Sequence, residues 1–192
     1  DVNEIQDTAR NLLEEGCEAL SIIFINSYAN DQNEKIAKGV IKDIWPNEHI
    51  TVSSEILPEI REFERASTST LNAILQPVLS HYLGALDETL TNRGFLGQVL
   101  IVQSNGGVMS VDNAKALPIK TALSGPAAGV IAASHIGVTA GYPNIVSCDM
   151  GGTSFDVSLI SDGQSKLAAQ TSIDFGMVVR SPMVEIITIG AG

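Results

Sequence analysis

Residues 145–160 constrain the fold of this chain more than any other stretch, because they have the pattern of two short strands around a glycine pair. Their sequence is Ile-Val-Ser-Cys-Asp-Met-Gly-Gly-Thr-Ser-Phe-Asp-Val-Ser-Leu-Ile. In the second half, Phe155, Val157 and Leu159 alternate with polar residues. Alternation with a period of two is typical of a strand. We therefore predict a β-hairpin with the Gly-Gly-Thr segment at its tip.

The tip of this predicted hairpin has two interpretations. In the first it binds a phosphate group, because glycines let backbone N–H groups approach an anion and Thr153 adds a hydroxyl donor. Asp149 and Asp156, one at each foot, would then hold a metal ion or orient a water molecule. In the second, the segment is only a tight turn and the aspartates are turn formers. Asp149 directly follows an apolar strand, where sites usually form, and this favours the first interpretation.

Residues 149–157, with the sequence Asp-Met-Gly-Gly-Thr-Ser-Phe-Asp-Val, resemble the second phosphate loop of the ATPase superfamily that contains actin, the sugar kinases and the heat-shock chaperones. Three more stretches are similar to the hydantoinase A/5-oxoprolinase family and occur in that family's order: residues 54–67, 103–110 and 123–130. The resemblance implies an α/β fold of actin-like, ribonuclease H-like lobes. In each lobe helices flank a sheet, and two lobes close on a magnesium nucleotide.

The same resemblance implies a fragment of a longer protein that spans the end of one lobe and the start of the next. Residues 1–68 would belong to the family's N-terminal region, and residues 69–192 to the start of its hydantoinase A/oxoprolinase domain. A structural boundary between lobes is expected near residue 140, in a breaker-rich link. The family's first phosphate loop would lie upstream of Asp1, so the isolated fragment is expected to be inactive.

The resemblance also implies roles for individual residues. The expected phosphate-binding residues are Gly151, Gly152, Thr153 and Ser154, with ATP bound as its Mg²⁺ or Mn²⁺ complex. Asp149 and Asp156 would be the catalytic carboxylates, and Asp149 would also reach the metal ion through a water molecule. The weaker candidates for substrate binding are Glu55, Arg61, Asn105, Gly106 and Gly107.

Three of these stretches also have a purely structural interpretation. Residues 55–65 form a charged linker running into a helix, with surface ion pairs that contribute about 0.5 kcal/mol each. The Asn105-Gly106 pair is typical of an ordinary turn. Ser124, followed by Gly-Pro, is expected to cap a helix whose N-terminus suits an anion, yet the small residues of that helix also suit close packing. The residues leave these alternatives open.

For the whole protein, the resemblance implies an ATP-dependent cyclic amidase of the hydantoinase or 5-oxoprolinase type. Such an enzyme phosphorylates the oxygen of a lactam or imide, so that water opens the ring. A ketone carboxylase subunit of the acetone type shares these motifs. In a different class, so does a nucleotide-switched chaperone or reactivating factor. The implied partners are a small cyclic amide substrate and a second subunit or domain of the hydantoinase B type, in an oligomer.

The charge balance argues against other classes of partner. The chain has 22 acidic and 11 basic side chains, a net charge of -11. Nucleic acids and anionic membranes attract basic faces, so neither is an expected partner. The sequence has no secretory signal and no apolar run near about 18 residues, so we expect a cytoplasmic protein. Cys17 and Cys148 lie among apolar residues and are expected to be buried free thiols.

Elsewhere the hydrophobic pattern predicts alternating strands and helices. Helical spacing covers residues 4–15 and 34–45, while residues 19–25 and 50–53 are strand-like, which together give a parallel βαβ unit. Residues 67–90 predict a long helix with an apolar stripe toward the core. Pro77 should kink it or break it in two. Further strands are expected at residues 98–103, 166–172 and 178–189.

Overall fold

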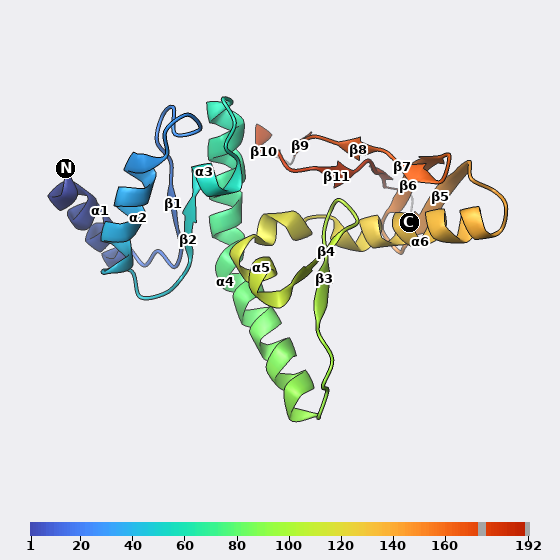
Figure 1. Cartoon of the computed structure of the whole chain (residues 1–192), viewed down its shortest axis with the longest axis horizontal. Helices are drawn as coiled ribbons and strands as arrows, with labels where there is room; N and C mark the ends of the chain where they lie inside the picture. Colours follow the sequence, from blue (N-terminus) through green and yellow to red (C-terminus); the bar gives the residue numbers. More distant parts are fainter. Residues whose placement is uncertain (173–175, 191–192) are drawn as a thin grey trace. The chain divides into compact units, whose positions relative to one another are not determined.

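The structure, a computed structural model, describes residues 1–172 and 176–190, which fall into two compact units (Figure 1). Unit 1 contains Asp1–Gly97, Val111–Ile119 and the described part of Ser172–Arg180. Unit 2 contains Gln98–Ser110, Lys120–Thr171 and the described part of Ser181–Gly192. The lobe boundary predicted near residue 140 falls inside unit 2, between its long helix and its hairpin.

Unit 1 begins with a helix followed by a parallel βαβ unit, as predicted. The elements are α1 (Val2–Glu14), β1 (Leu20–Ile22), α2 (Gln32–Lys42) and β2 (Ile50–Val52). Leu20 pairs with Ile50 in parallel register, and both are buried with Trp45 in one aliphatic core. The chain leaves α1 through Gly16, whose φ of +84° is a conformation that glycine adopts freely. β1 is shorter than predicted, and Ile25 beyond it is 82% exposed.

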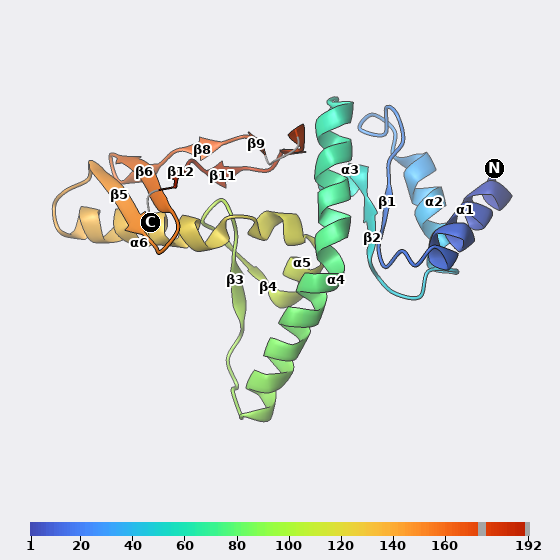
Figure 2. The same cartoon turned by 180° about the vertical axis from the view of Figure 1, so that it is seen from behind.

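The long predicted helix, α4 (Glu62–Asn92), is continuous over 31 residues with Pro77 inside it. The predicted break into two helices does not occur. Figures 1 and 2 show the helix changing direction about midway along its length, which a proline inside a helix causes.

The buried face of α4 is mainly polar, and Leu83 is the member of the predicted apolar stripe that is buried. The buried residues with polar side chains are Arg65, Thr68, Ser69, Asn72 and Gln76. By contrast Ile74, Val78 and Tyr82 are 59%, 72% and 61% exposed. The predicted apolar stripe is therefore right at Leu83 and wrong at Ile74, Val78 and Tyr82, which face solvent.

Hydrogen bonds to neighbouring elements explain this polar burial. The amide of Asn72 donates to the hydroxyl of Thr51 on β2 at 2.9 Å and to the carbonyl of Ala116 at 3.2 Å, at the end of α5 (Val111–Ala116). Gln76 donates to the same carbonyl at 3.1 Å. Buried polar groups are tolerated where they find partners, and here the partners come from two separate elements of unit 1. A short helix, α3 (Ser53–Ile56), follows β2 and completes this side.

Replacing Asn72 tests this arrangement. Asn72→Ala removes these hydrogen bonds and leaves the buried N–H of Ile119, which donates to Asn72 at 3.3 Å, without its partner. We therefore expect the free energy of unfolding to fall by about 2 kcal/mol. Ile74→Ala, on the exposed stripe, should change it by less than about 0.5 kcal/mol. Urea denaturation of both variants measures the difference. A larger loss for Ile74→Ala than for Asn72→Ala would restore the apolar stripe as the core face.

Unit 2 is built around a long helix and an antiparallel sheet. Its elements are β3 (Leu100–Val102), β4 (Val108–Ser110), α6 (Ser124–Thr139), β5 (Ile145–Met150), β6 (Phe155–Ser161), β7 (Gln164–Ser165), β8 (Leu167–Ala168), β11 (Met183–Val184) and β12 (Ile187–Ile189). The main sheet has the order β12-β6-β5, and β7 pairs with β6. Ala127 and Val130 of α6 form the core with Ile160 and Val184.

Several predicted strands are shorter than expected. Residues 98–103 give only β3, an antiparallel partner of β4, with Leu100 48% exposed rather than buried. Residues 166–172 give β8 and β9 (Thr171–Ser172), and residues 178–189 give β10 (Val178–Val179), β11 and β12. A 3-10 turn, Pro118–Thr121, precedes α6. No helix in the described ranges combines the length and apolar composition that a membrane crossing requires.

Candidate functional site

The hairpin predicted at residues 145–160 is present in unit 2. Its strands β5 and β6 are antiparallel, and the register places Asp149 directly opposite Asp156. The N–H of Gly151 donates to the carbonyl of Ser154 at 3.0 Å, which closes the tip. The two carboxylates therefore stand side by side at the base of a short turn.

The tip of the hairpin is open. Gly151, Gly152 and Thr153 are exposed, and the N–H groups of Gly152 and Thr153 make no hydrogen bond within the described part of the chain. Neither glycine adopts a left-handed backbone, and a Cβ placed on Gly152 would meet nothing within 4 Å. The fold itself thus does not require glycine at this position. A ligand that approaches the backbone closely would require it, which fits phosphate binding.

Both carboxylates lie on the sheet face that packs against α6. Side chains alternate along a strand, so Asp156 shares its face with Ile160, which is buried against Ala127 and Val130. The opposite face carries Leu159, which is 61% exposed. The polar positions of the hairpin therefore face the helix, and part of its apolar side faces water.

A cavity of about 290 Å³ lies between α6 and the hairpin, and both carboxylates line it. Pro126 and Gly129 line it from the first half of α6. Pockets for small molecules usually range from about 300 to 1,000 Å³, so this cavity lies at the lower end of that range and has room for a phosphate group. Cys148, expected to be buried, is an exposed free thiol that also lines this cavity.

The two carboxylates have different surroundings. Thr188 Oγ1 donates to Asp156 Oδ1 at 2.6 Å, whereas Asp149 is exposed and has no hydrogen-bond partner among the described residues. Neither forms an ion pair with a basic side chain in that part of the chain. Like charges directly opposite each other destabilise a strand pair, and a divalent cation would offset their repulsion.

The ligand set fits a cation only in part. Across the described ranges, no three His, Cys, Asp or Glu side chains come together as a metal site. Asp149 and Asp156 would thus supply a fraction of the coordination shell. Mg²⁺ commonly takes the remainder from water and from phosphate oxygens, so the pair fits a metal that arrives with a nucleotide.

The start of α6 differs from the prediction. Leu123, with a φ of 62°, occupies the cap position and no side chain caps the helix, so the expected capping role of Ser124 is wrong. Ser124 is instead the first helical residue. First-turn N–H groups without a cap, together with the helix dipole, favour a nearby anion. Pro126 places this end of α6 at the cavity.

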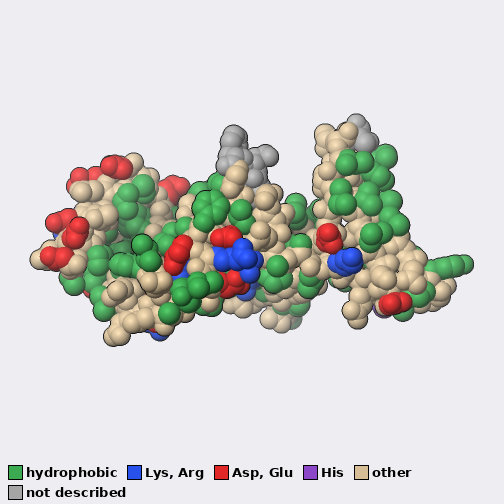
Figure 3. Space-filling model, turned by 90° about the horizontal axis from the view of Figure 1, so that it is seen from above, with side chains coloured by type: hydrophobic (Ala, Val, Ile, Leu, Met, Phe, Trp, Pro, Cys, Tyr) green, Lys and Arg blue, Asp and Glu red, His purple; other side chains and the backbone are tan. Residues whose placement is uncertain are grey.

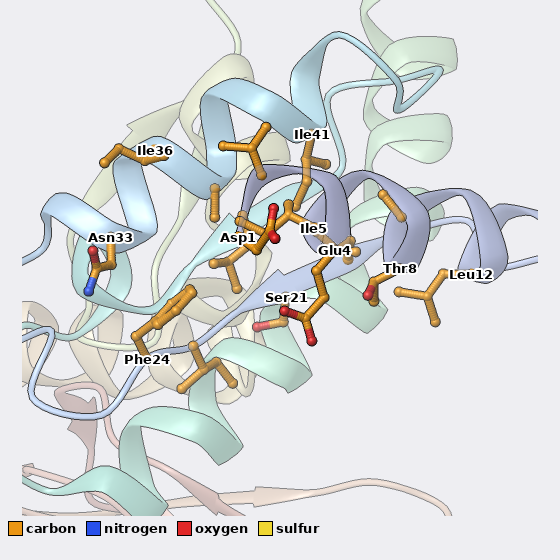
Figure 4. Close-up of a pocket in the computed structure, with 16 residues that line it drawn as sticks. Asp1, Glu4, Ile5, Thr8, Leu12, Ser21, Phe24, Asn33, Ile36 and Ile41 are labelled. Carbon is orange, nitrogen blue, oxygen red and sulfur yellow. The ribbon is translucent and has the colours of Figure 1, made fainter.

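A separate cavity of about 690 Å³ lies in unit 1 between α1, β1 and α2. Figure 4 shows Ile5, Ile36 and Ile41 around it, with Asp1 and Glu4 on the first turn of α1. The lining is mainly aliphatic, and among the described residues that form it no Lys, Arg or His side chain accompanies the two carboxylates. This groove lacks a catalytic arrangement, so the hairpin remains the better candidate.

Comparison with known protein families assigns the chain to one of them. The family described as Hydantoinase/oxoprolinase matches residues 65–192. This chain belongs to the hydantoinase/oxoprolinase family.

Individual relatives within the family agree with this assignment. The 5-oxoprolinase of Saccharomyces cerevisiae is 33% identical over 100% of the chain, which is 15% of that protein. Caprolactamase subunit alpha of Pseudomonas jessenii is 30% identical over 93% of the chain and 26% of its own length. The chain thus spans less than a third of these relatives.

Two solved structures confirm the predicted α/β fold. The crystal structure of the ATP-dependent caprolactamase from Pseudomonas jessenii matches with a TM-score of 0.85 and 29% identity, over 98% of this chain and 27% of the other. A nucleotide-free structure of acetone carboxylase matches with a TM-score of 0.84 and 28% identity, over 99% and 27%.

The Asn-Gly-Gly segment of this family member forms the turn between β3 and β4. Gly106 has a φ of +84°, and the N–H of Gly107 donates to the side chain of Asn105 at 2.8 Å. The N–H of Gln103 donates to the carbonyl of Gly107 at 2.8 Å. These bonds are those of an ordinary glycine turn. A substrate-binding part for Asn105, Gly106 and Gly107 stays a prediction.

Glu55 and Arg61 lie in unit 1, in surface ion pairs. Lys38 Nζ lies 2.7 Å from a carboxylate oxygen of Glu55. Arg61 donates to Glu64 at 2.9 Å, and this hydrogen bond lowers the pKa of Glu64 below its ordinary value. The contribution of Glu55 and Arg61 to substrate binding stays a prediction.

Sequence reasoning missed two buried charges in unit 1. Glu34 and Arg65 are both 0% exposed and hold the two backbone groups of Phe24, just beyond β1. Glu34 accepts from the N–H of Phe24 at 2.9 Å, and Arg65 donates to its carbonyl at 2.7 Å. Arg65 also pairs with Glu62. The residues around Glu34 and Arg65 have the pattern of a solvated helix face, so the local sequence does not predict that these side chains are buried.

The carboxylate of Glu34 should make the stability of unit 1 depend on pH. Burial would raise the pKa of Glu34, but hydrogen bonds from Ser53, Ser54 and the N–H of Phe24 together hold it below its ordinary value. Its stabilising contribution is therefore complete above the unfolded pKa of about 4.3 and is lost as pH falls through the lowered folded pKa.

Glu34→Gln should remove that dependence. The variant is expected to be less stable than the wild type at neutral pH, and to lose less stability on acidification. Urea denaturation between about pH 7 and pH 3 measures this, with the exposed Glu14→Gln as the control. Equal acid sensitivity of wild type and Glu34→Gln would show that Glu34 is not the group responsible.

Proposed function

We propose that this chain is the phosphate-binding part of an ATP-dependent enzyme that opens a lactam or imide ring. The supporting observation is the hairpin tip, where two exposed glycines and unbonded N–H groups stand above a pair of opposed carboxylates. Relatives named 5-oxoprolinase and ATP-dependent caprolactamase act on lactams by their names, which supports this substrate class.

Each residue of the tip has a part in this proposal. The N–H groups of Gly152 and Thr153 and the hydroxyls of Thr153 and Ser154 donate to phosphate oxygens. ATP would supply the phosphoryl group to the amide oxygen, which makes the amide carbon electrophilic enough for water to add. The ring then opens as the C–N bond breaks, and phosphate is released. Asp149 and Asp156 orient the metal ion or its water molecules, with Asp156 held by Thr188. Catalysis of this kind depends mainly on positioning and on charge neutralisation.

We base the proposed domain bounds, partner, metal and location on the family. Residues 1–68 would end the preceding region, and residues 69–192 would begin the hydantoinase A/oxoprolinase domain, with the second lobe starting near residue 140. The caprolactamase relative is described as a subunit, which supports a partner of the hydantoinase B type in an oligomer. We further propose Mg²⁺ or Mn²⁺ as the metal and the cytoplasm as the location. On the face shown in Figure 3, basic side chains lie beside acidic ones and form no continuous basic surface for nucleic acid.

A ketone carboxylase subunit is the second candidate, because the acetone carboxylase structure matches almost as well as the caprolactamase. Phosphate release from ATP separates the two candidates. The complete protein that carries these residues would be incubated with 5-oxoproline, with a hydantoin, or with acetone and bicarbonate. Stimulation by a cyclic amide supports the proposed function. Stimulation only by acetone and bicarbonate replaces it, and turnover that responds only to a protein partner indicates a chaperone.

Asp149→Asn tests the carboxylate. We expect kcat for ATP-dependent ring opening to fall by about 10²-fold or more, as for other positioned carboxylates. Asp162→Asn is the matched control, because Asp162 is exposed in the next turn at a φ of 52°, which asparagine tolerates. Steady-state kinetics of both variants gives the comparison. Wild-type kcat in Asp149→Asn would remove Asp149 from the site.

Gly152→Ala tests phosphate binding at the hairpin tip. Because a Cβ there meets nothing within 4 Å, the melting temperature should stay the same or rise slightly, while a bound phosphate would meet the new methyl group. We expect nucleotide affinity to fall by about tenfold, equivalent to about 1.4 kcal/mol. Calorimetric titration with ATP measures this, and Gly39→Ala, equally unobstructed on α2, is the control. Unchanged affinity in Gly152→Ala would favour the plain turn.

A further inference from the structure

Three polar residues form one row across the main sheet of unit 2. Its strand order is β12-β6-β5, and the register places Thr188 opposite Asp156 and Asp156 opposite Asp149. Residues opposite each other in adjacent strands share one face of the sheet. The row therefore joins a hydroxyl and two carboxylates at the level just below the hairpin tip.

Asp156 lies in the middle of this row and is held on one side only. Thr188 Oγ1 donates to Asp156 Oδ1 at 2.6 Å, so one oxygen of this carboxylate is engaged from β12. On the other side stands Asp149, about 5 Å away between Cβ atoms as in any directly opposed pair. Without the hydroxyl, repulsion between the carboxylates would leave the side chain of Asp156 free to turn away.

We propose that Thr188 is a positioning residue, which fixes Asp156 so that the two carboxylates jointly face a divalent cation. This inference rests on the proposed function. Thr188 does not touch the cation or the nucleotide; it acts through Asp156. Removing a group that orients a metal-binding side chain in this way typically weakens metal affinity by about 10- to 100-fold.

A role in folding alone is a poor explanation for this hydrogen bond. Thr188 and its bond to Asp156 are exposed, and water replaces an exposed hydrogen bond at little cost. Valine keeps the β-branched shape and the strand preference of threonine and removes only the donor. Thr188→Val therefore separates positioning from strand formation.

The experiment measures Mn²⁺ binding by electron paramagnetic resonance, in the complete protein with ADP present. Thr188→Val should bind Mn²⁺ about tenfold more weakly than the wild type, the size typical of a lost supporting bond at a metal site. Thr188→Ser keeps the hydroxyl and should bind like the wild type. Thr139→Val removes an exposed hydroxyl that bonds only within α6, at 2.8 Å, and should also bind like the wild type. Melting temperatures of all three should match.

The outcomes distinguish this inference from the proposed function. Wild-type affinity in Thr188→Val overturns the positioning role and leaves the proposed function standing. Equal weakening in Thr188→Ser and Thr188→Val also overturns it, because the hydroxyl would then be irrelevant. Wild-type protein that binds neither Mn²⁺ nor ADP overturns the proposed function, and this inference with it.

Discussion

The antiparallel register of β5 and β6 is the constraint on which the candidate site depends. Ile145 pairs with Ile160, and Ile160 is 3% exposed against α6. Side chains alternate, so a slip of β6 by one residue would expose Ile160 and turn Asp156 away from the helix and from Asp149. An apolar residue at the far end of the hairpin thus keeps Asp149 and Asp156 at the cavity.

The small residues of α6 have different roles at the two ends of the helix. A Cβ on Gly137 would lie 2.9 Å from the carbonyl of Tyr142 and 2.9 Å from the side chain of Ile145, so glycine is needed for the close turn into β5. A Cβ on Gly129 would meet nothing within 4 Å, and Gly129 lines the cavity. Close packing therefore explains Gly137 but not Gly129, which borders the open space beside the carboxylates.

Local sequence patterns predicted which residues form a helix or a strand better than they predicted which side of that element is buried. Period-two alternation located the hairpin, and the helical spacing around two apolar strands located the βαβ unit. The same spacing in α4 could not tell which side is buried, because Asn72 and Gln76 donate to the carbonyl of Ala116, 44 and 40 positions along the chain. A buried polar face depends on such distant partners, and short windows of sequence do not contain them.

In the candidate site, too, the local sequence predicted the residues but not their orientation or their distant partners. The resemblance pointed to Asp149 and Asp156 through a contiguous motif, while their orientation toward α6 came only from strand pairing. Thr188 went unnoticed because it meets Asp156 from 32 residues away, across a strand pair that the sequence does not specify. Glu34 and Arg65 escaped notice because buried and solvated charges have the same local pattern.

The exposed stripe of α4 has a consequence for how the chain behaves in solution. Ile74, Val78 and Tyr82 form a ridge in water, and each Å² of such surface is unfavourable by about 25 cal/mol. Copies of the chain, each with a net charge of -11, repel one another and keep these ridges apart. Added salt screens that repulsion but leaves the apolar attraction intact, so colloidal stability here declines as ionic strength rises.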